Sequence, residues 1–244
     1  MHQYFTDTEL STGMTWIPDA RILHHMKDVL HMDNDTVRLV HEGKAWLGHV
    51  VQEGKQLSVI IDEEDRRYNE LPYDLTLCIA LVRREKFELI LQKAGELGAS
   101  RIVPFVSSRC VVKEKKEKAD RQKERWQSIL LEASEQCKRN RVPSITDIVS
   151  IHDLKQYTAD CNVVPYENAY GASPMLSTVL KKGSVSCAIG PEGGFSEEEI
   201  AELNAMGFQC VSLGRRILRA ETACMYSLSV IGEWMEVHED IHDR

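Results

Sequence analysis

The strongest constraint on the fold is a change of rhythm after Pro72, where buried-type strands begin to alternate with amphipathic helices. Residues 75–82 are almost uninterrupted in apolar character, as in a strand that is covered on both faces. Residues 85–97 then place apolar side chains at helical spacing, and Gly98 follows as a C-cap. This alternation predicts an α/β domain with a mainly parallel sheet. The same pattern continues with strands at 102–106, 161–165, 185–189 and 209–213 and helices at about 118–140, 174–181, 197–206 and 221–237.

Residues 1–70 follow a different pattern, in which short strands dominate. TVRLV and AWLGHVV flank a turn at 41–44, and QLSVIID follows a second turn at 53–55. One helix interrupts them and starts at Pro18 and Asp19. We expect a small β-barrel-like module here. The polar segment 62–72 is the best candidate for a linker, so we predict two domains, 1–70 and 71–244.

Composition excludes several classes of protein. The longest apolar run, at 75–82, is far shorter than the roughly 20 residues that a membrane-spanning helix needs. The first ten residues show no basic region followed by an apolar run, which a secretory signal would have. The 7 cysteines are an odd number without a C-x-x-C pair, and the histidines at 24 and 25 are not part of an H-E-x-x-H motif. We therefore expect a cytoplasmic protein with no membrane segment and no metal.

The net charge of −8 argues against generic, charge-driven binding of nucleic acids. The basic residues are nevertheless unevenly distributed, and a locally basic face is compatible with the sequence. They crowd into one stretch that contains Lys113, Lys115, Lys116, Lys118, Arg121, Lys123, Arg125, Lys138, Arg139 and Arg141.

The strongest local signal is the segment AIGPEGGFSEEE at 188–199. A buried strand ends there in three glycines, and Ser196 with Glu199 forms a capping box for the next helix. Ligands of open α/β sheets bind beyond the carboxyl ends of strands, where glycines let the backbone approach a ligand closely. An ordinary tight turn explains this segment equally well when it is taken alone. The spacing matches neither the dinucleotide-binding motif nor the P-loop.

A second segment, SLGRRILRAETA at 212–223, follows the next strand. Three arginines come after a glycine turn, and Glu221 and Thr222 then open the last helix, where their side chains suit the unpaired amides and the positive end of the helix dipole. We expect the two glycine-bearing loops to lie at adjacent strand ends and to converge on one pocket. Taken singly, each arginine is more commonly a solvated loop charge.

A third feature is the spacing of Glu132, Glu135 and Arg139, which share one face of the long helix. An ion pair on a solvated helix explains this spacing without any chemistry. The sequence also contains no G-x-S-x-G motif, so the signature of a serine hydrolase is missing.

Taken together, these segments closely resemble the RsmE family of ribosomal RNA methyltransferases. The resemblance is carried by IALVRREKFELILQKAGELGASRIVPF, RWQSILLEASEQCKRNRVP, GPEGGFSEEE and LGRRILRAETA. It extends to the N-terminal module, where HHMKDVL is similar to the family's PUA-like RNA-binding domain, and so covers essentially the whole chain. Two positions depart from the family pattern: His31, where relatives usually carry arginine, and Gly95, where similar sequences generally have threonine.

The resemblance implies methylation of N3 of one uridine in 16S ribosomal RNA by a homodimer that uses S-adenosyl-L-methionine. The fold implied is a C-terminal SPOUT domain at 71–244, with a mainly parallel sheet and a deep trefoil knot, and an N-terminal PUA-like β-barrel at 1–70. The partner implied is 16S rRNA or the assembled small ribosomal subunit. The cofactor loops would be 164–167, 190–194 and 213–222, with backbone groups of the third holding the adenine. The residues implied to bind the cofactor are Val164, Pro165, Glu167, Gly190, Pro191, Glu192, Gly193, Leu213, Gly214, Ile217, Leu218 and Thr222.

Methylation at uridine N3 requires that the nitrogen first lose its proton, so the protein must favour the uridine anion. We expect Arg219 to stabilise the developing negative charge and Glu221 to support it or to accept the proton. Arg139, with Glu132 or Glu135, is expected to meet the target base from the same or the partner subunit. The basic residues at 113–141 and the N-terminal module would contact phosphates. Two alternatives remain open: a SPOUT methyltransferase that acts on another RNA such as tRNA, and a non-catalytic RNA-binding protein of ribosome assembly.

Overall fold

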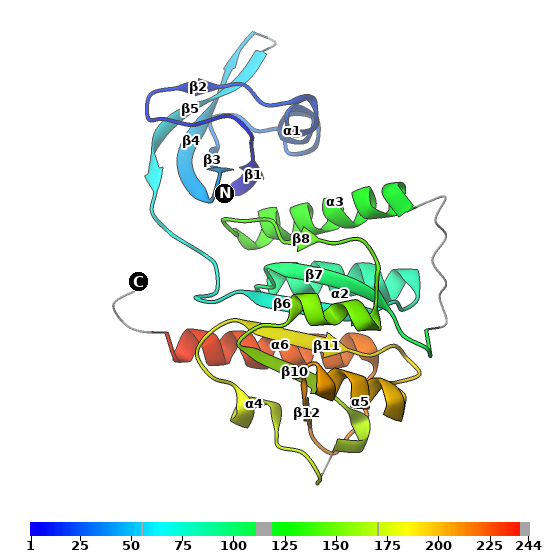
Figure 1. Ribbon diagram of the computed structural model, residues 1–244. Coiled ribbons are helices and arrows are strands. Elements are labelled where there is room, and N and C mark those ends of the chain that lie inside the picture. Colours follow the sequence, from blue (N-terminus) through cyan, green and yellow to red (C-terminus); the bar gives the residue numbers. More distant parts are fainter. Residues whose placement is uncertain (55, 111–118, 170, 240–244) are drawn as a thin grey trace. The chain divides into compact units, whose positions relative to one another are not determined.

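The chain divides into two compact units, which Figure 1 shows in a computed structural model. The structure describes residues 1–54, 56–110, 119–169 and 171–239. The first unit contains residues 1–70 and 134–141, and the second contains residues 71–133 and 142–244. Residues 134–141, which the sequence places in the second domain, pack with the first unit in the structure.

The first unit is built on a five-stranded sheet with the order β1-β3-β4-β5-β2. Its strands are β1 (His2–Phe5), β2 (Thr15–Trp16), β3 (Thr36–His41), β4 (Lys44–Glu53) and β5 (Gln56–Asp65). β1 pairs with β3 in parallel, and the other neighbours are antiparallel. β3 and β4 meet in a two-residue turn, where Glu42 and Gly43 both take left-handed backbone angles (φ 47° and 83°). Such angles match the twist of a tight hairpin.

The helix of the first unit begins where the sequence predicts. The carboxylate of Asp19 accepts a hydrogen bond from the Ile22 backbone N–H at 2.8 Å and so caps α1 (Ala20–His24). The helix continues as the π-helical turn η1 (His25–Val29). His31, one of the two departures from the family pattern, follows with a left-handed backbone angle (φ 49°).

The segment predicted as a linker is held by buried polar contacts within the first unit. Arg38, only 1% exposed, donates hydrogen bonds to the Asp65 carboxylate at 2.7 Å and to the Asn140 side chain at 3.2 Å. Glu70 forms an ion pair with Arg139 and accepts the backbone N–H of Asn140 at 2.8 Å. The break between the two units, at 70/71, falls inside this predicted linker, and two of its carboxylates are partners of buried arginines.

The second unit contains a seven-stranded sheet in which every pairing is parallel. The strand order is β12-β10-β11-β6-β7-β8, and β9 also pairs with β7. The bounds are β6 (Leu75–Ala80), β7 (Arg101–Val106), β8 (Ser144–Ile145), β9 (Val149–Ser150), β10 (Cys161–Pro165), β11 (Val185–Ile189) and β12 (Gln209–Val211). The prediction of an α/β domain with a mainly parallel sheet is confirmed.

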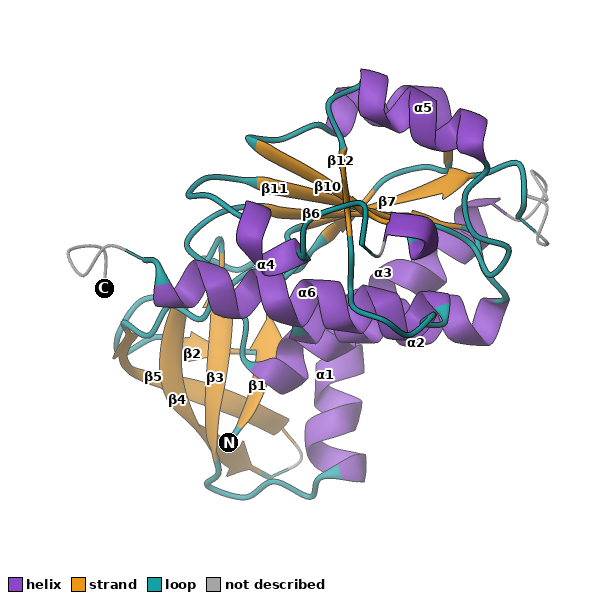
Figure 2. Ribbon diagram, turned by 90° about the horizontal axis from the view of Figure 1, so that it is seen from below, coloured by secondary structure: helices purple, strands orange, loops and turns teal. Residues whose placement is uncertain are grey.

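Helices cover both faces of this sheet, as Figure 2 shows. Because side chains alternate along a strand, Leu75, Leu77 and Ile79 of β6 join one apolar core, and Cys78 and Ala80 join another. The first core is closed by α2 (Arg84–Glu96), α3 (Ala119–Cys137), α4 (Leu176–Val179) and α6 (Ala220–Val237), and the second by α5 (Glu197–Ala205) and the 3-10 helix η3 (Ile151–Tyr157).

Gly95, the second departure from the family pattern, lies where α2 meets α3. A Cβ added to Gly95 would lie 3.0 Å from the Cβ of Ala133. Glycine therefore permits a closer approach of the two helices than a threonine would.

The described residues contain no helix long and apolar enough to cross a membrane. Within the same part of the chain, no three His, Cys, Asp or Glu side chains are grouped so that they could hold a metal ion.

Candidate functional site

A pocket of about 470 Å³ lies at the carboxyl ends of β10, β11 and β12. These three strands are neighbours and run parallel, so the loops that follow them meet at one edge of the sheet. The sequence predicts the two glycine-bearing loops at adjacent strand ends. They are not adjacent: β10 lies between β11 and β12, and its own loop completes the pocket between the other two.

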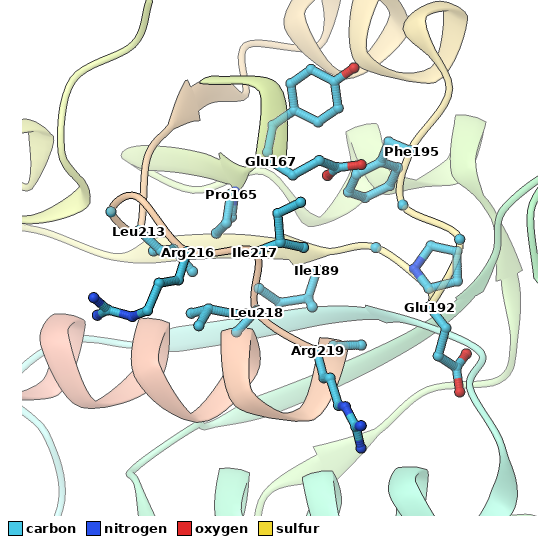
Figure 3. A pocket seen from close by; sticks show the side chains of 18 of the residues that line it. Pro165, Glu167, Ile189, Glu192, Phe195, Leu213, Arg216, Ile217, Leu218 and Arg219 are labelled. Carbon is cyan, nitrogen blue, oxygen red and sulfur yellow. The ribbon is translucent and has the colours of Figure 1, made fainter. Parts of the chain in front are cut away.

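Three loops and the first turns of α2 and α6 line the pocket (Figure 3). We call these loops the β10 loop (165–167), the β11 loop (189–195) and the β12 loop (213–220). Ile189, Ile217 and Leu218 lie at the centre of the view, and the charged ends of Arg216 and Arg219 reach toward its edges. The lining residues are Lys86, Pro165, Tyr166, Glu167, Ile189, Gly190, Pro191, Glu192, Gly193, Gly194, Phe195, Leu213, Gly214, Arg215, Arg216, Ile217, Leu218, Arg219, Ala220 and Ala223.

The glycines of the β11 loop allow a close packing that other residues would prevent. Gly194 has a left-handed backbone angle (φ 68°), and a Cβ there would collide with the Glu167 carboxylate of the β10 loop. A Cβ at Gly190 would lie 3.0 Å from the Phe195 ring. The backbone of this loop therefore lies at the pocket wall with no side chain in between.

The β11 loop ends in the predicted capping box, which the structure contains. The Glu199 backbone N–H donates to the Ser196 hydroxyl at 3.2 Å, and the Ser196 N–H donates to the Glu199 carboxylate at 2.9 Å. Arg109 holds the loop from another side, since its guanidinium donates to the Gly193 carbonyl at 3.2 Å.

The β12 loop carries positive charge into the first turn of α6. Arg219 is the N-cap of this helix, with an extended backbone (φ −68°, ψ 155°), and its side chain is exposed. No hydrogen bond or ion pair involves the Arg219 guanidinium among the described residues. It is therefore free to donate to a ligand in the pocket. Ile217 is 84% exposed in the same loop.

Lys86, in the first turn of α2, adds a lysine to the three arginines that line the pocket. Its ammonium Nζ lies 3.5 Å from Oε1 of Glu192 and 3.4 Å from Oε2 of Glu221. The Oε2 atom of Glu221 is buried and has no hydrogen-bond partner in the described part of the chain, so its contact with Lys86 is an ion pair without a hydrogen bond.

Most of the residues expected at the cofactor site line the pocket. The two exceptions are Val164, which is buried inside β10, and Thr222, which lies in the first turn of α6. Of the three residues expected to act in catalysis, Arg219 lines the pocket, and Glu221 reaches it through Lys86.

Arg139 is not among the lining residues. It belongs to the first unit, where its buried guanidinium is paired with Glu70. The two acids expected beside it also lie outside the pocket: Glu135 pairs with Arg21 at 3.0 Å, and Glu132 is exposed. The structure thus gives Arg139 a partner inside its own unit.

Sequence reasoning missed Lys86, Ile189, Phe195 and Ala223. The signal for Lys86 is its place in the first helical turn after a buried strand, since that position lies at the carboxyl edge of a parallel sheet. Ile189 and Phe195 flank the predicted glycine loop directly, and Ala223 lies one turn into α6.

Comparison with known proteins shows the class of this protein. The family model described as an RNA methyltransferase domain matches residues 69–232, which include every residue that lines the pocket. The chain thus contains an RNA methyltransferase domain, and the pocket lies within it.

Individual relatives narrow this class. Ribosomal RNA small subunit methyltransferase E of Bacillus subtilis is 33% identical, over 97% of this chain and 98% of its own length. The enzyme of the same name from Synechocystis is 34% identical, over 88% of this chain and 71% of its own length. The chain belongs to the family of ribosomal RNA small subunit methyltransferase E.

Solved structures agree with this membership. The Neisseria gonorrhoeae member, solved with bound S-adenosyl methionine, has a TM-score of 0.85 and 29% identity, covering 95% of this chain and 96% of that chain. A putative methyltransferase from Legionella pneumophila, also solved with its bound cofactor SAM, has a TM-score of 0.84 and 29% identity, covering 94% of this chain and 96% of that chain.

Proposed function

We propose that this protein transfers a methyl group from S-adenosyl-L-methionine to N3 of one uridine in the 16S RNA of the small ribosomal subunit. Dependence on this cofactor and methylation of small-subunit ribosomal RNA follow from membership of the family and from the two cofactor-bound relatives. One observation carries the assignment of the site: the β10, β11 and β12 loops form a single pocket at the carboxyl edge of the sheet.

The pocket suits the cofactor in size and in chemistry. Its volume of about 470 Å³ lies in the ordinary range for small-molecule sites. Apolar side chains of Ile189 and Leu218 offer contacts for an adenine ring, and the glycine backbone of the β11 loop offers polar groups without crowding. The bound cofactor supplies the methyl group as an electrophile, and Glu192 would face its polar parts.

Arg219 would favour the uridine anion, because its guanidinium lines the pocket and has no partner among the described residues. A fixed positive charge in a partly enclosed site stabilises charge that develops on the base oxygens when N3 loses its proton. Glu221, two residues further on, would support Arg219 or take up the proton directly or through water. We infer no place for Arg139 in this step, because Glu70 already holds its guanidinium.

Selection of the RNA would fall to the first unit and to basic residues near α3. The five-stranded sheet of the first unit supports the proposal that this unit is a PUA-like barrel. Lys113, Lys115, Lys116 and Lys118 lie outside the described residues, and Lys123 and Arg125 are paired with Asp147 and Glu88. Exposed Arg121 is thus the better phosphate contact on α3.

We further propose that the chain is threaded into a trefoil knot around the β12 loop and that the protein is a homodimer. We also propose that it acts in the cytoplasm, where ribosomal subunits are made.

The test is to incubate the protein with isotopically labelled S-adenosyl-L-methionine and small ribosomal subunits that lack the modification. The RNA is then digested, and the labelled nucleoside is identified by mass spectrometry. Labelled 3-methyluridine is the expected product. A different labelled nucleoside would contradict the proposed target. Cofactor binding without any transfer would point to another RNA such as tRNA as the substrate, and no cofactor binding at all would favour a non-catalytic RNA-binding protein.

A further inference from the structure

One lysine joins three separate elements at the pocket. Lys86 belongs to α2, Glu192 to the β11 loop and Glu221 to the first turn of α6, and the Lys86 ammonium lies within 3.5 Å of an oxygen of each carboxylate. α2 and α6 pack against each other in the same apolar core, so the backbone positions of Lys86 and Glu221 are fixed. The β11 loop is held from its other side by Arg109 and by the capping box of α5, and the ion pair of Glu192 with Lys86 joins it to these helices.

The two carboxylates have no other cation. Among the described residues, Lys86 is the only basic side chain within ion-pair distance of either Glu192 or Glu221. All three side chains are largely shielded from water, with 29%, 23% and 15% of the Lys86, Glu192 and Glu221 side chains exposed. A buried oxygen of Glu221 also has no hydrogen bond, so Lys86 is its only compensation.

We infer that Lys86 is a positioning residue that holds the β11 loop against the first turn of α6. The inference rests on the proposed function, since the β11 loop is proposed to bind the cofactor and α6 begins next to Arg219. Without the ammonium, the two negative charges that share it would have no cation between them. Their repulsion would move the β11 loop outward and weaken the binding of the cofactor.

This role differs from direct contact with the ligand in one respect that can be measured. If Lys86 acts through the two carboxylates, removing Lys86 and one carboxylate together removes the repulsion and restores much of the binding. If Lys86 contacts the ligand itself, the second substitution restores nothing.

The experiment compares the full-length protein with Lys86→Met, Lys86→Arg and the double variant Lys86→Met/Glu221→Gln. Lys93→Met is the matched control, because Lys93 lies on the same helix, forms an ion pair with Glu96 and does not line the pocket. Affinity for S-adenosylhomocysteine is measured by calorimetry, and folding is checked by thermal unfolding.

We expect the Kd for S-adenosylhomocysteine to rise about tenfold or more in Lys86→Met. In Lys86→Arg and Lys93→Met the Kd should stay near the wild-type value. In the double variant it should return most of the way to the wild-type value. Recovery of affinity without recovery of kcat is expected in the double variant, since Glu221 has its own proposed role in catalysis.

Hydrogen exchange of the backbone amides in the β11 loop is a second measurement that needs no ligand. It reports on the mobility of the loop even if the affinity for the cofactor is lost for a reason unrelated to Lys86. Exchange should be faster in Lys86→Met than in Lys93→Met, and slower again in the double variant. Unchanged exchange and unchanged Kd in Lys86→Met would overturn the inference, and so would a loss of affinity that the double variant does not recover. Failure of the wild-type protein to bind S-adenosylhomocysteine would instead contradict the proposed function, and hydrogen exchange would still decide the role of Lys86.

Discussion

Glu199 accepts a hydrogen bond from the Ser108 backbone N–H at 2.7 Å, across a separation of 91 residues in the chain. The same carboxylate caps α5 through the Ser196 N–H, so it joins the segment that follows β7 to the β11 loop of the pocket. Burial raises the pKa of Glu199, but the hydrogen bonds from Ser196 and Ser108 outweigh burial and lower the pKa below its usual value. One buried carboxylate thus fixes both segments next to the proposed cofactor site.

We predict that Glu199→Gln destabilises the protein by about 1–3 kcal/mol, because a neutral amide is a weaker acceptor and leaves one backbone N–H poorly satisfied. Affinity for S-adenosylhomocysteine should fall as well, since the β11 loop loses its anchor. Urea unfolding and calorimetry measure the two effects. Glu197→Gln is the control, because Glu197 is exposed in the same helical turn. Equal stability of both variants would contradict this role for Glu199.

The capping role of Glu199 could be predicted from the sequence, and its contact with Ser108 could not. Caps, glycine turns and the apolar faces of helices are encoded within a few residues, which is why β10 and β11 have the predicted bounds. Contacts such as Lys86 with Glu192 depend on strand order, and local patterns do not specify that order. For the same reason β1 was missed, since it is short and its partner β3 lies more than 30 residues away.

The buried ion pairs of the predicted linker could not be predicted from the sequence for a related reason. Asp65 and Glu70 lie in a polar segment, and polar segments are usually solvated. Their partners are Arg38 and Arg139, which come from distant parts of the sequence. Buried charges of this kind cannot be recognised from composition, because the same residues on a surface would give the same pattern.

For Arg219→Ala we predict a fall in kcat of about 10²–10³-fold, with little change in Kd for S-adenosylhomocysteine. The reason is that Arg219 is proposed to stabilise charge on the uridine, which develops only during the reaction. Arg219→Lys should recover part of the rate, because it keeps the charge and loses the fork-shaped geometry. Single-turnover methylation of small ribosomal subunits separates the chemical step from cofactor binding. Full turnover in Arg219→Ala would exclude this role.

The pH dependence of stability should reveal Asp65. Hydrogen bonds from Arg67 and Arg38 lower the pKa of Asp65 to about 2 from its ordinary value of 3.8. Burial of the carboxyl group acts in the opposite direction but is outweighed. A depressed carboxyl pKa contributes stability above the unfolded-state value and loses it as the pH falls toward the folded-state value. Asp65→Asn should therefore cost at least about 2 kcal/mol at pH 7.

The difference between wild type and Asp65→Asn should shrink below about pH 4, with roughly half of the linkage contribution lost by pH 3. Urea unfolding at pH 7, 5, 4 and 3 measures this. Asp62→Asn is a suitable control, because Asp62 lies on the same strand and is exposed. A difference between Asp65→Asn and wild type that does not vary with pH would show that Asp65 stabilises the first unit through its shape alone.

Substitutions of Arg139 and of its partner Glu70 can show whether Arg139 acts in folding or in catalysis. The Arg139 side chain is 4% exposed and pairs with Glu70, whose carboxylate also accepts the backbone N–H groups of Asn140 and Arg141 at 2.8 and 2.9 Å. Removing one partner of a buried pair leaves an uncompensated charge, so Glu70→Gln and Arg139→Ala should each lower the free energy of unfolding by about 3–5 kcal/mol. If the pair acts only on the fold, whatever fraction of Arg139→Ala remains folded should methylate RNA at close to the wild-type rate per folded molecule. A variant with normal stability and a hundredfold lower kcat would instead restore the catalytic role that the helical spacing of Arg139 and Glu135 suggests.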